Sequence, residues 1–148
     1  MIEVAIALPI LILLVFGAID WGMLRQQQHA LAHGVREGAR RAAVAEWGTE
    51  TSCTSATAWP GTVRTICATK AAIDEPGVAI RVLVPQYRVG QTVTVCAQRP
   101  ADTLTGITDR FVTGQILRSI TRMRIEELGN GGMNSATEDT TRDWSWCT

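Results

Sequence analysis

The sequence lacks an excess of positive charge, and this argues against one broad class of function. It has 148 residues with 14 basic and 14 acidic side chains, so its formal net charge is zero. Nucleic-acid-binding domains usually carry a basic patch or stripe. Residues 1–47 contain four charges of each sign and residues 48–148 contain ten of each, so neither part has such an excess. We therefore expect no nucleic acid among the partners.

The sequence also lacks the motifs of common catalytic sites. It contains no HExxH, GxSxG, phosphate-binding loop or GxGxxG. Adjacent carboxylates such as Asp74 and Glu75 point apart on a strand or flank a turn. His29 and His33 are four residues apart and could face one metal on a helix, but two surface histidines are the simpler interpretation. We predict no catalytic residue, metal site or cofactor, and hence no enzyme.

Charged residues are missing from positions 4–19, where 11 of 16 residues are Val, Ile, Leu or Phe. Their insertion into a bilayer is favourable by on the order of 5 kcal/mol. At a rise of ~1.5 Å per residue, positions 4–24 span about 31 Å, close to the thickness of a hydrocarbon core. Residues 1–24 are predicted to form a helix that crosses a membrane or lies in the core of a fibre.

A cleaved signal peptide is the alternative for this segment. It needs a positively charged start and a small-residue cleavage site. Met1, Ile2 and Glu3 precede the apolar run, and further helix-forming sequence follows it. A retained helix fits better, and the missing basic flank indicates that a leader has already been removed.

All four cysteines, Cys53, Cys67, Cys96 and Cys147, lie beyond the apolar segment and form no CxxC pair. Zinc sites usually contain such a close pair, so two disulfides are favoured over a metal site or free thiols. Three pairings are possible. We favour Cys53–Cys67, which would join a loop to a short helix, and Cys96–Cys147, which would tie the C-terminal tail to the central strand. Disulfides place residues 50–148 in an oxidising compartment.

The arginines after the apolar run oppose this topology. Arg25, Arg36, Arg40 and Arg41 would place their side of the membrane in the cytoplasm under the positive-inside rule. A basic leader that has been removed would resolve the conflict.

Helix-forming residues without proline continue the first helix through residues 25–47 as an amphipathic second half. After a polar loop, Pro60 begins a predicted short helix that ends near Ile73. Alternating apolar residues then predict three strands, the first two as a hairpin. The predicted strands cover residues 78–84, 89–97 and 117–126. Residues 100–113 are expected to be irregular, with room for a helical turn, and residues 129–148 to form a polar surface tail held by Cys147.

Glu3 and Pro9 are unusual within the apolar segment. A carboxylate at its mouth is costly in lipid unless it is paired or near the interface. Glu3 could interact with the positive end of the helix dipole. Alternatively, it could pair with the N-terminal amine of a neighbouring chain and set the axial register of a helix bundle. Pro9 clashes with the carbonyl of Ala5, so we expect a kink or a locally unwound turn, either as a simple transmembrane kink or with a role in packing.

Ala30, Gly34, Gly38 and Ala42 recur at every fourth position and form one narrow ridge on the helix. Small residues let helix backbones approach closely. Each glycine costs about 1 kcal/mol relative to alanine in a helix, so the ridge needs a compensating contact. Its partner could be the β-sheet of the same chain, another subunit, or both.

Several features of the first 44 residues occur together. They are an Ile-Glu-Val-Ala start, Leu8-Pro9, an apolar run, the Asp20-Trp21-Gly22 end, and the Gly-Val-Arg-Glu-Gly-Ala-Arg-Arg-Ala-Ala-Val helix of residues 34–44. This pattern resembles the opening of TadE-like pilus proteins. Residues 93–95 and 123–126 are similar to later strands of that family, but more weakly. The family glutamate corresponds to Glu3, two positions earlier than usual.

The resemblance implies a type IV pilin-like protein of a Tad-type pilus system. Such a precursor is cleaved by a prepilin peptidase and waits as a single-pass protein in the inner, or cytoplasmic, membrane. An assembly ATPase and an inner-membrane platform then move it into an extracellular pilus at the cell surface. That filament could be a helical homo-oligomer or could contain other pilins.

The expected fold class is α+β and pilin-like. A long N-terminal helix, hydrophobic in its first half, packs on a small antiparallel β-sheet within an extracellular head of residues 48–148. The first functional hypothesis is a pilin or pseudopilin that polymerises through this helix for adherence or secretion. The alternative is a membrane-anchored extracytoplasmic binding module or enzyme that does not polymerise.

Overall fold

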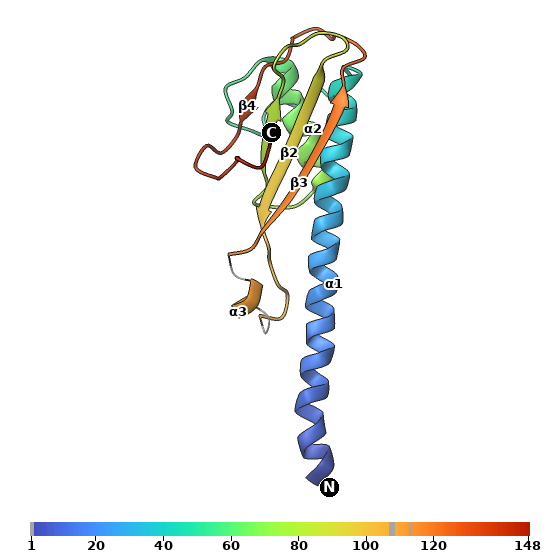
Figure 1. The fold of residues 1–148 in the computed structure, drawn as a ribbon, viewed down its shortest axis with the longest axis vertical. Helices are drawn as coiled ribbons and strands as arrows, with labels where there is room; N and C mark the ends of the chain where they lie inside the picture. The colour runs from blue at the N-terminus through green and yellow to red at the C-terminus, as the bar shows by residue number, and fades with distance from the viewer. Residues whose placement is uncertain (1, 107–108, 113) are drawn as a thin grey trace.

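A single long helix dominates the molecule. The computed structural model describes residues 2–106, 109–112 and 114–148, with the side chains of residues 2–5 and 111 outside that description. Helix α1 (Ile2–Ala43) has 42 residues, and its N-terminal half projects far from the rest of the chain (Figure 1). The C-terminal half packs into the head, so one helix belongs to both parts, as the sequence predicted.

Helix α1 ends at Ala43, four residues before the predicted end at Trp47. Ala45 has a left-handed backbone with φ of 55°, and the N–H of Glu46 donates to the carbonyl of Arg41 at 3.1 Å. This six-residue closure is a Schellman cap formed without glycine. The carbonyl of Ala43 also accepts a hydrogen bond from the N–H of Glu126 at 2.8 Å. The chain just after β3, the strand of residues 116–124, therefore helps to fix where α1 stops.

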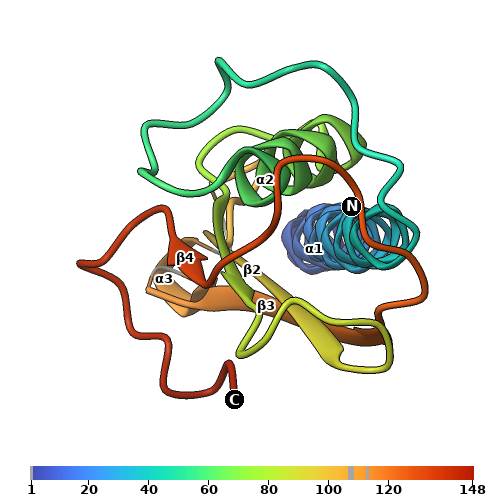
Figure 2. The same cartoon turned by 90° about the horizontal axis from the view of Figure 1, so that it is seen from above.

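Helix α2 (Pro60–Ile73) begins and ends where the sequence predicted. Pro60 occupies the first turn, where its missing N–H has no helical partner to lose. Asp74 adopts a left-handed conformation with φ of 51°, and its N–H donates to the carbonyl of Lys70 at 2.9 Å. The helix lies beside the C-terminal half of α1 (Figure 2).

Four antiparallel strands form one sheet in the order β3-β2-β1-β4. Strands β1 (Ala79–Leu83) and β2 (Thr92–Pro100) form the predicted hairpin, with Val82 opposite Val95. Strand β3 (Ile116–Arg124) pairs with the other edge of β2. The short β4 (Ala136–Thr137) lies in the predicted surface tail and was not expected.

Both long helices cover one face of the sheet, α1 against β2 and β3, and α2 against β1 (Figure 2). Alternate residues of each strand point toward these helices, so every second strand residue enters the main core. The core is made of aliphatic side chains and Met133. Its buried members are Leu31, Val35, Ala39, Ala42, Ile66, Ile73, Val78, Ile80, Val82, Val84, Val93, Val95, Ala97, Ile125 and Met133.

The C-terminal segment covers part of the opposite face of the sheet. Trp144 and Cys147 are buried there against Cys96 and Ala79, and Trp146 packs beside them. The indole N–H of Trp144 donates to the carbonyl of Asp139 at 2.7 Å. Most of residues 129–148 are exposed or partly exposed, and Cys147 ties them to β2, but Trp144 and Cys147 belong to a second small core that the sequence did not predict.

The remaining short helix, α3 (Asp109–Val112), lies in the segment that was expected to be irregular with a helical turn. Helix α3 lies below the sheet, to the side of α1 (Figure 1).

Candidate functional site

The N-terminal half of α1 presents an apolar surface to its surroundings. An 18-residue window of this helix has a mean hydropathy of 2.2, and 6% of that window is buried. By length and composition the helix could cross a membrane. The core helix of a soluble protein would instead be largely buried. The exposed apolar side chains are Ile6, Leu8, Ile10, Leu11, Ile12, Leu13, Leu14, Val15, Phe16 and Ile19. This surface needs lipid or other apolar helices around it.

Two predicted site residues lie in this apolar half. Glu3 is in the first turns of α1, but its side chain lies outside the described residues, so its pairing stays a prediction. The helix continues without interruption through Pro9, so the backbone is not unwound there. A kink at Pro9 stays a prediction.

The small-residue ridge faces α2. A Cβ added at Gly38 would lie 1.9 Å from the Thr69 Oγ1 atom, and one added at Gly34 would lie 2.2 Å from the Ile73 Cγ1 atom. Ala42 is fully buried at the end of the same ridge. The intrachain partner suggested from the sequence was the sheet, and α2 takes that place at both glycines. A second subunit would have to displace α2 to reach these two residues.

Thr65 and Thr69 allow a polar stretch of α2 to face the glycines. Both side chains are fully buried. The Thr69 hydroxyl donates to the carbonyl of Thr65 at 2.7 Å, and the Thr65 hydroxyl donates to that of Gly61 at 2.8 Å. Each hydroxyl thus donates its hydrogen bond within its own helix and needs no partner on α1. The two backbones can approach without leaving a buried donor unpaired.

A carboxylate at the end of the apolar run binds the chain after β2. Asp20 is 1% exposed. Its carboxylate accepts hydrogen bonds from the N–H groups of Leu104 at 3.3 Å and Thr105 at 3.1 Å, and from the Thr105 hydroxyl at 2.5 Å. Asp20 thereby accepts hydrogen bonds from a loop that is more than 80 residues later in the sequence. In the sequence, Asp20 stands out only as part of the Asp20-Trp21-Gly22 end of the family pattern.

Two turns further along α1, Gln27 holds the same loop. Its amide nitrogen donates to the carbonyl of Asp102 at 3.0 Å. The Asp102 carboxylate pairs with Arg99 at 2.8 Å, and Arg99 also pairs with Glu75 at 2.7 Å. The Arg99 side chain is 3% exposed, so its charge depends on these partners. Residues 99–105 are therefore braced against α1 where the apolar half meets the head.

Replacing Asp20 with alanine should release this brace without unfolding the head. Hydrogen bonds to a charged acceptor are worth roughly 1.5–3 kcal/mol, so amide hydrogen exchange at Leu104 and Thr105 should accelerate by about tenfold to a hundredfold. Exchange measured by mass spectrometry on the chain in detergent tests this. Exchange in α2 should stay unchanged, and Asp20→Asn, which keeps one acceptor oxygen, should show a smaller effect. Unchanged exchange at residues 104–105 in the alanine variant would contradict the bracing role.

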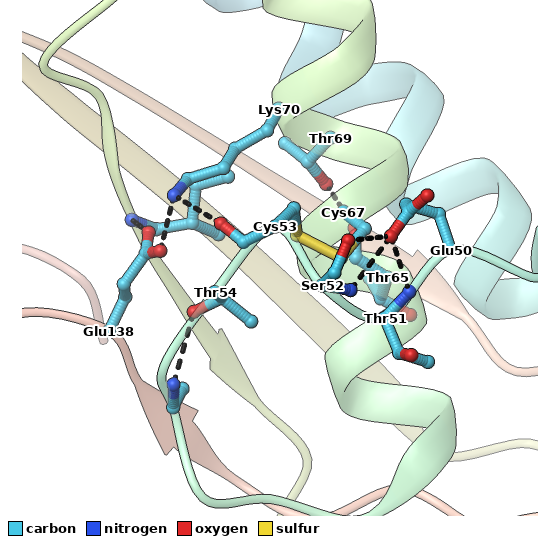
Figure 3. Close-up of a disulfide and its surroundings, with 12 residues drawn as sticks. Glu50, Thr51, Ser52, Cys53, Thr54, Thr65, Cys67, Thr69, Lys70 and Glu138 are labelled. Atoms are coloured by element: carbon cyan, nitrogen blue, oxygen red, sulfur yellow. Dashed lines mark hydrogen bonds and ion pairs between the residues drawn. A yellow bond between two sulfur atoms is a disulfide. The ribbon is translucent and has the colours of Figure 1, made fainter.

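The disulfides of the structure join the two pairs favoured from the sequence, Cys53–Cys67 and Cys96–Cys147. Figure 3 shows the first, which links the loop before α2 to that helix. Beside it, the Lys70 ammonium donates to the carbonyl of Cys53 at 3.1 Å and pairs with the carboxylate of Glu138. The loop, α2 and the C-terminal segment meet at this one lysine, the single lysine of the sequence.

Several carboxylates of the head have lowered pKa values, among them Glu37 and Glu50. Hydrogen bonds from the side chains of Arg40 and Arg41 lower the pKa of Glu37 to about 2. The hydroxyl and N–H of Ser52 lower the pKa of Glu50 (Figure 3). Because the pKa of Glu37 is lowered in the folded state, its interaction with Arg40 and Arg41 stabilises the fold fully when the pH is above the ordinary pKa near 4.5. This stabilisation is lost as the pH falls toward 2. For a surface pair this amounts to less than about 1 kcal/mol.

His29 and His33 are exposed on α1. Within the described chain, no group of three or more His, Cys, Asp or Glu side chains is placed to hold a metal ion. The expected lack of a metal or cofactor stays a prediction.

The helix that carries these features, α1, is the part of the chain that is similar to a known protein family. Searches against curated proteins and against solved structures give no match. Residues 1–40 match the family model described as TadE-like protein. The matched range includes Glu3, Pro9, Asp20, Gly34 and Gly38, and stops before the sheet. The resemblance noted in the sequence is thus confirmed over residues 1–40.

Proposed function

We propose that this chain is a structural subunit, a pilin or pseudopilin, of a Tad-type pilus. One observation carries the proposal: a single helix is exposed and apolar in its first half and forms the core of the head in its second. An exposed apolar helix is stable when lipid or other apolar helices surround it. The head stands clear of that half and leaves it accessible along most of its length (Figure 1).

The same apolar side chains would serve in both surroundings. Before assembly, residues 1–24 would cross the inner membrane once, with the head on the outer side. In the filament, neighbouring helices would replace the lipid, so transfer need not expose these side chains to water. The head would then face outward, because its main core is already filled by its own strands and helices.

The family match supports this assignment and the partners that accompany it. A TadE-like chain would be processed by a prepilin peptidase and assembled by an ATPase with an inner-membrane platform. The filament would contain either copies of this chain or other pilins as well. A non-enzymatic, structural role is consistent with the family.

Replacing Glu3 with alanine should leave membrane insertion intact but reduce incorporation into fibres at least tenfold. Removal of a charge lowers the cost of placing the segment in lipid. Loss of a carboxylate that pairs with a neighbour's N-terminal amine would leave that amine uncompensated in an apolar core, which is strongly unfavourable. Immunoblots of the membrane and sheared surface fractions measure both quantities. Negative-stain microscopy of the sheared material shows whether fibres form.

Glu46→Ala is the matched control, since Glu46 is an exposed acidic residue beyond the end of α1. It should assemble normally. Normal fibre yield from Glu3→Ala would refute the pairing. If the unaltered chain stays in the membrane fraction and forms no fibres, the filament role itself is wrong, and a membrane-anchored binding module or enzyme becomes the better description.

A further inference from the structure

The sheet of the head has one long edge strand. The order β3-β2-β1-β4 places the nine-residue β3 at one edge and the two-residue β4 at the other (Figure 1). Every residue of β3 is exposed or half-buried, whereas seven of the nine residues of β2 are buried. A long exposed edge of this kind is a template with which another strand can pair.

Three hydrogen bonds show which backbone groups of β3 face away from the sheet. Just after β3, the N–H of Ile125 donates to the carbonyl of Gln91 at 2.7 Å, and the carbonyl of Ile125 accepts from the N–H of Gly90 at 2.8 Å. Both groups of Ile125 therefore point to the β2 side. Successive strand residues direct these groups to opposite sides, so the even-numbered residues of β3 direct theirs to the free edge. The carbonyl of Arg118 agrees, because it accepts from the Gln28 amide of α1 at 3.1 Å.

Beyond Arg118, three residues leave this edge free for a partner. Apart from the pairing with β2, no hydrogen bond in the described part of the chain uses the backbone N–H or carbonyl of Ile120, Arg122 or Arg124. In an antiparallel pair, a residue whose groups face the partner exchanges both hydrogen bonds with the residue directly opposite. A strand added at this edge would therefore bond to β3 through alternate residues, those opposite the even-numbered positions.

The side chains of the even-numbered residues form a basic row on the face of the sheet that faces away from α1. Ile120 lies opposite Cys96 in the register, and Cys96 belongs to the second small core on that face. Residues directly opposite each other place their side chains on the same face, and so do alternate residues of one strand. The exposed members of this row are Ile116, Arg118, Ile120, Arg122 and Arg124.

The charge of this row selects the kind of strand that can pair. Arg118 approaches the carboxylate of Asp143 at 3.6 Å, whereas Arg122 and Arg124 form no ion pair with a carboxylate of the described chain. The side chains of an added strand would lie about 4.5–5.5 Å from those opposite them. Acidic side chains would be attracted there and basic ones repelled. An antiparallel pair of two β3 strands centred on Ile120 would set Arg118 opposite Arg122, so a second copy of β3 is disfavoured.

We propose that the free edge of β3 binds an extended acidic segment of another protein chain, which adds as an antiparallel strand along residues 118–124. The backbone groups at the edge supply the hydrogen bonds. Arg118, Arg122 and Arg124 select acidic residues at the positions opposite them, and Ile120 accepts an apolar one. This goes beyond the filament role and does not depend on it, because the edge belongs to the head alone.

Titration of the full chain in a non-ionic detergent with a labelled peptide tests the site. The probe is Glu-Thr-Glu-Thr-Val-Thr-Glu, whose Glu and Val residues match the basic row in antiparallel order. Fluorescence anisotropy at low salt measures binding, since salt screens surface charges. The peptide should bind saturably and at least tenfold more tightly than the same peptide with Lys in place of Glu. Equal affinity would overturn the selection by charge, and no saturable binding would overturn the site.

Two methylated peptides separate strand addition from attraction between charges alone. A methyl group on the backbone nitrogen of Val removes a donor that would face β3. The same group on the Thr after Val removes a donor that would face away from β3, so this peptide is the matched control. The Val-methylated peptide should bind at least tenfold more weakly than the Thr-methylated one. Equal affinity of the two would refute strand addition, whatever the effect of charge.

Ile120→Pro should weaken binding of the unmethylated acidic peptide at least tenfold, because it removes an N–H from the free edge. Proline is tolerated in an edge strand where its nitrogen faces outward. Ile120→Ala is the matched control, since it keeps that N–H and should bind severalfold more tightly than the proline variant. Equal affinity of the two would contradict the proposal. If Ile120→Pro fails to fold, as judged by incomplete disulfides, the two methylated peptides decide the same question on the unaltered chain.

Arg122→Gln should weaken binding of the acidic peptide severalfold, because it removes one cation from the row. The matched control is Arg88→Gln, which removes the same charge from the exposed turn between β1 and β2 and should bind normally. Equal loss in both variants would show that only the net charge of the head matters, which would overturn the place assigned to the site.

Discussion

Replacing Gly38 with alanine is expected to destabilise the head by about 2 kcal/mol, although alanine is the better helix former. The added Cβ would lie 1.9 Å from the Oγ1 atom and 2.9 Å from the Cβ atom of Thr69. Rotation of Thr69 could move its hydroxyl away but not its Cβ, which is fixed to the backbone of α2. The two helices would have to separate, and both bury core residues against the sheet.

Gly22→Ala provides the matched control in the same helix. A Cβ at Gly22 meets no described atom within 4 Å, so that substitution should be neutral or should stabilise the helix by roughly 0.5–1 kcal/mol. Thermal unfolding of both variants in the same detergent, followed by circular dichroism, gives the comparison. Equal melting temperatures would show that α1 and α2 can separate at little cost, contrary to the packing described.

Removing the Cys96–Cys147 disulfide should be the more damaging of the two cysteine changes. Loop-closure entropy predicts about 4 kcal/mol for its 51-residue separation and about 3 kcal/mol for the 14-residue separation of Cys53–Cys67. The longer disulfide also holds the C-terminal segment on the sheet. Its loss should expose the buried Trp144, which the shorter disulfide does not contact.

The measurement compares the double serine variants of each pair during urea unfolding. Tryptophan fluorescence should shift to the red at lower urea in Cys96→Ser/Cys147→Ser than in Cys53→Ser/Cys67→Ser. A second, separate transition for the C-terminal segment would fit the same account. Identical unfolding midpoints with unchanged fluorescence in the folded state would contradict it, because the segment would then be held by its other contacts alone.

Local signals in the sequence were sufficient for the main elements of the fold. Pro60 marks the start of α2, and apolar alternation marks the strands, because both act within a few residues. The end of α1 could not be placed in the same way. Ala45 adopts a left-handed conformation that usually favours glycine, and the N–H of Glu126 reaches Ala43 from a distant part of the chain.

The sequence predicts which residues of α1 make close contacts, but not which part of the chain they contact. The four-residue spacing of Gly34 and Gly38 predicts close approach of another backbone, but spacing cannot tell a helix partner from a sheet. Asp20 did carry a signal, as the acidic residue that ends a long uncharged run. Its partners Leu104 and Thr105 lie in an irregular segment, where no periodicity indicates which way the chain turns.

The unbroken path of α1 has a mechanical consequence. Tension along a fibre would act on the first half of the helix and would reach the head through the same backbone, without a flexible joint in between. Inside the head it would act as shear along the α1–α2 contact and across the sheet. The hydrogen bonds of Asp20 and Gln27 to residues 102–105 would carry load first, since they lie nearest to the apolar half. Such a subunit would transmit a pull rigidly until these contacts yield.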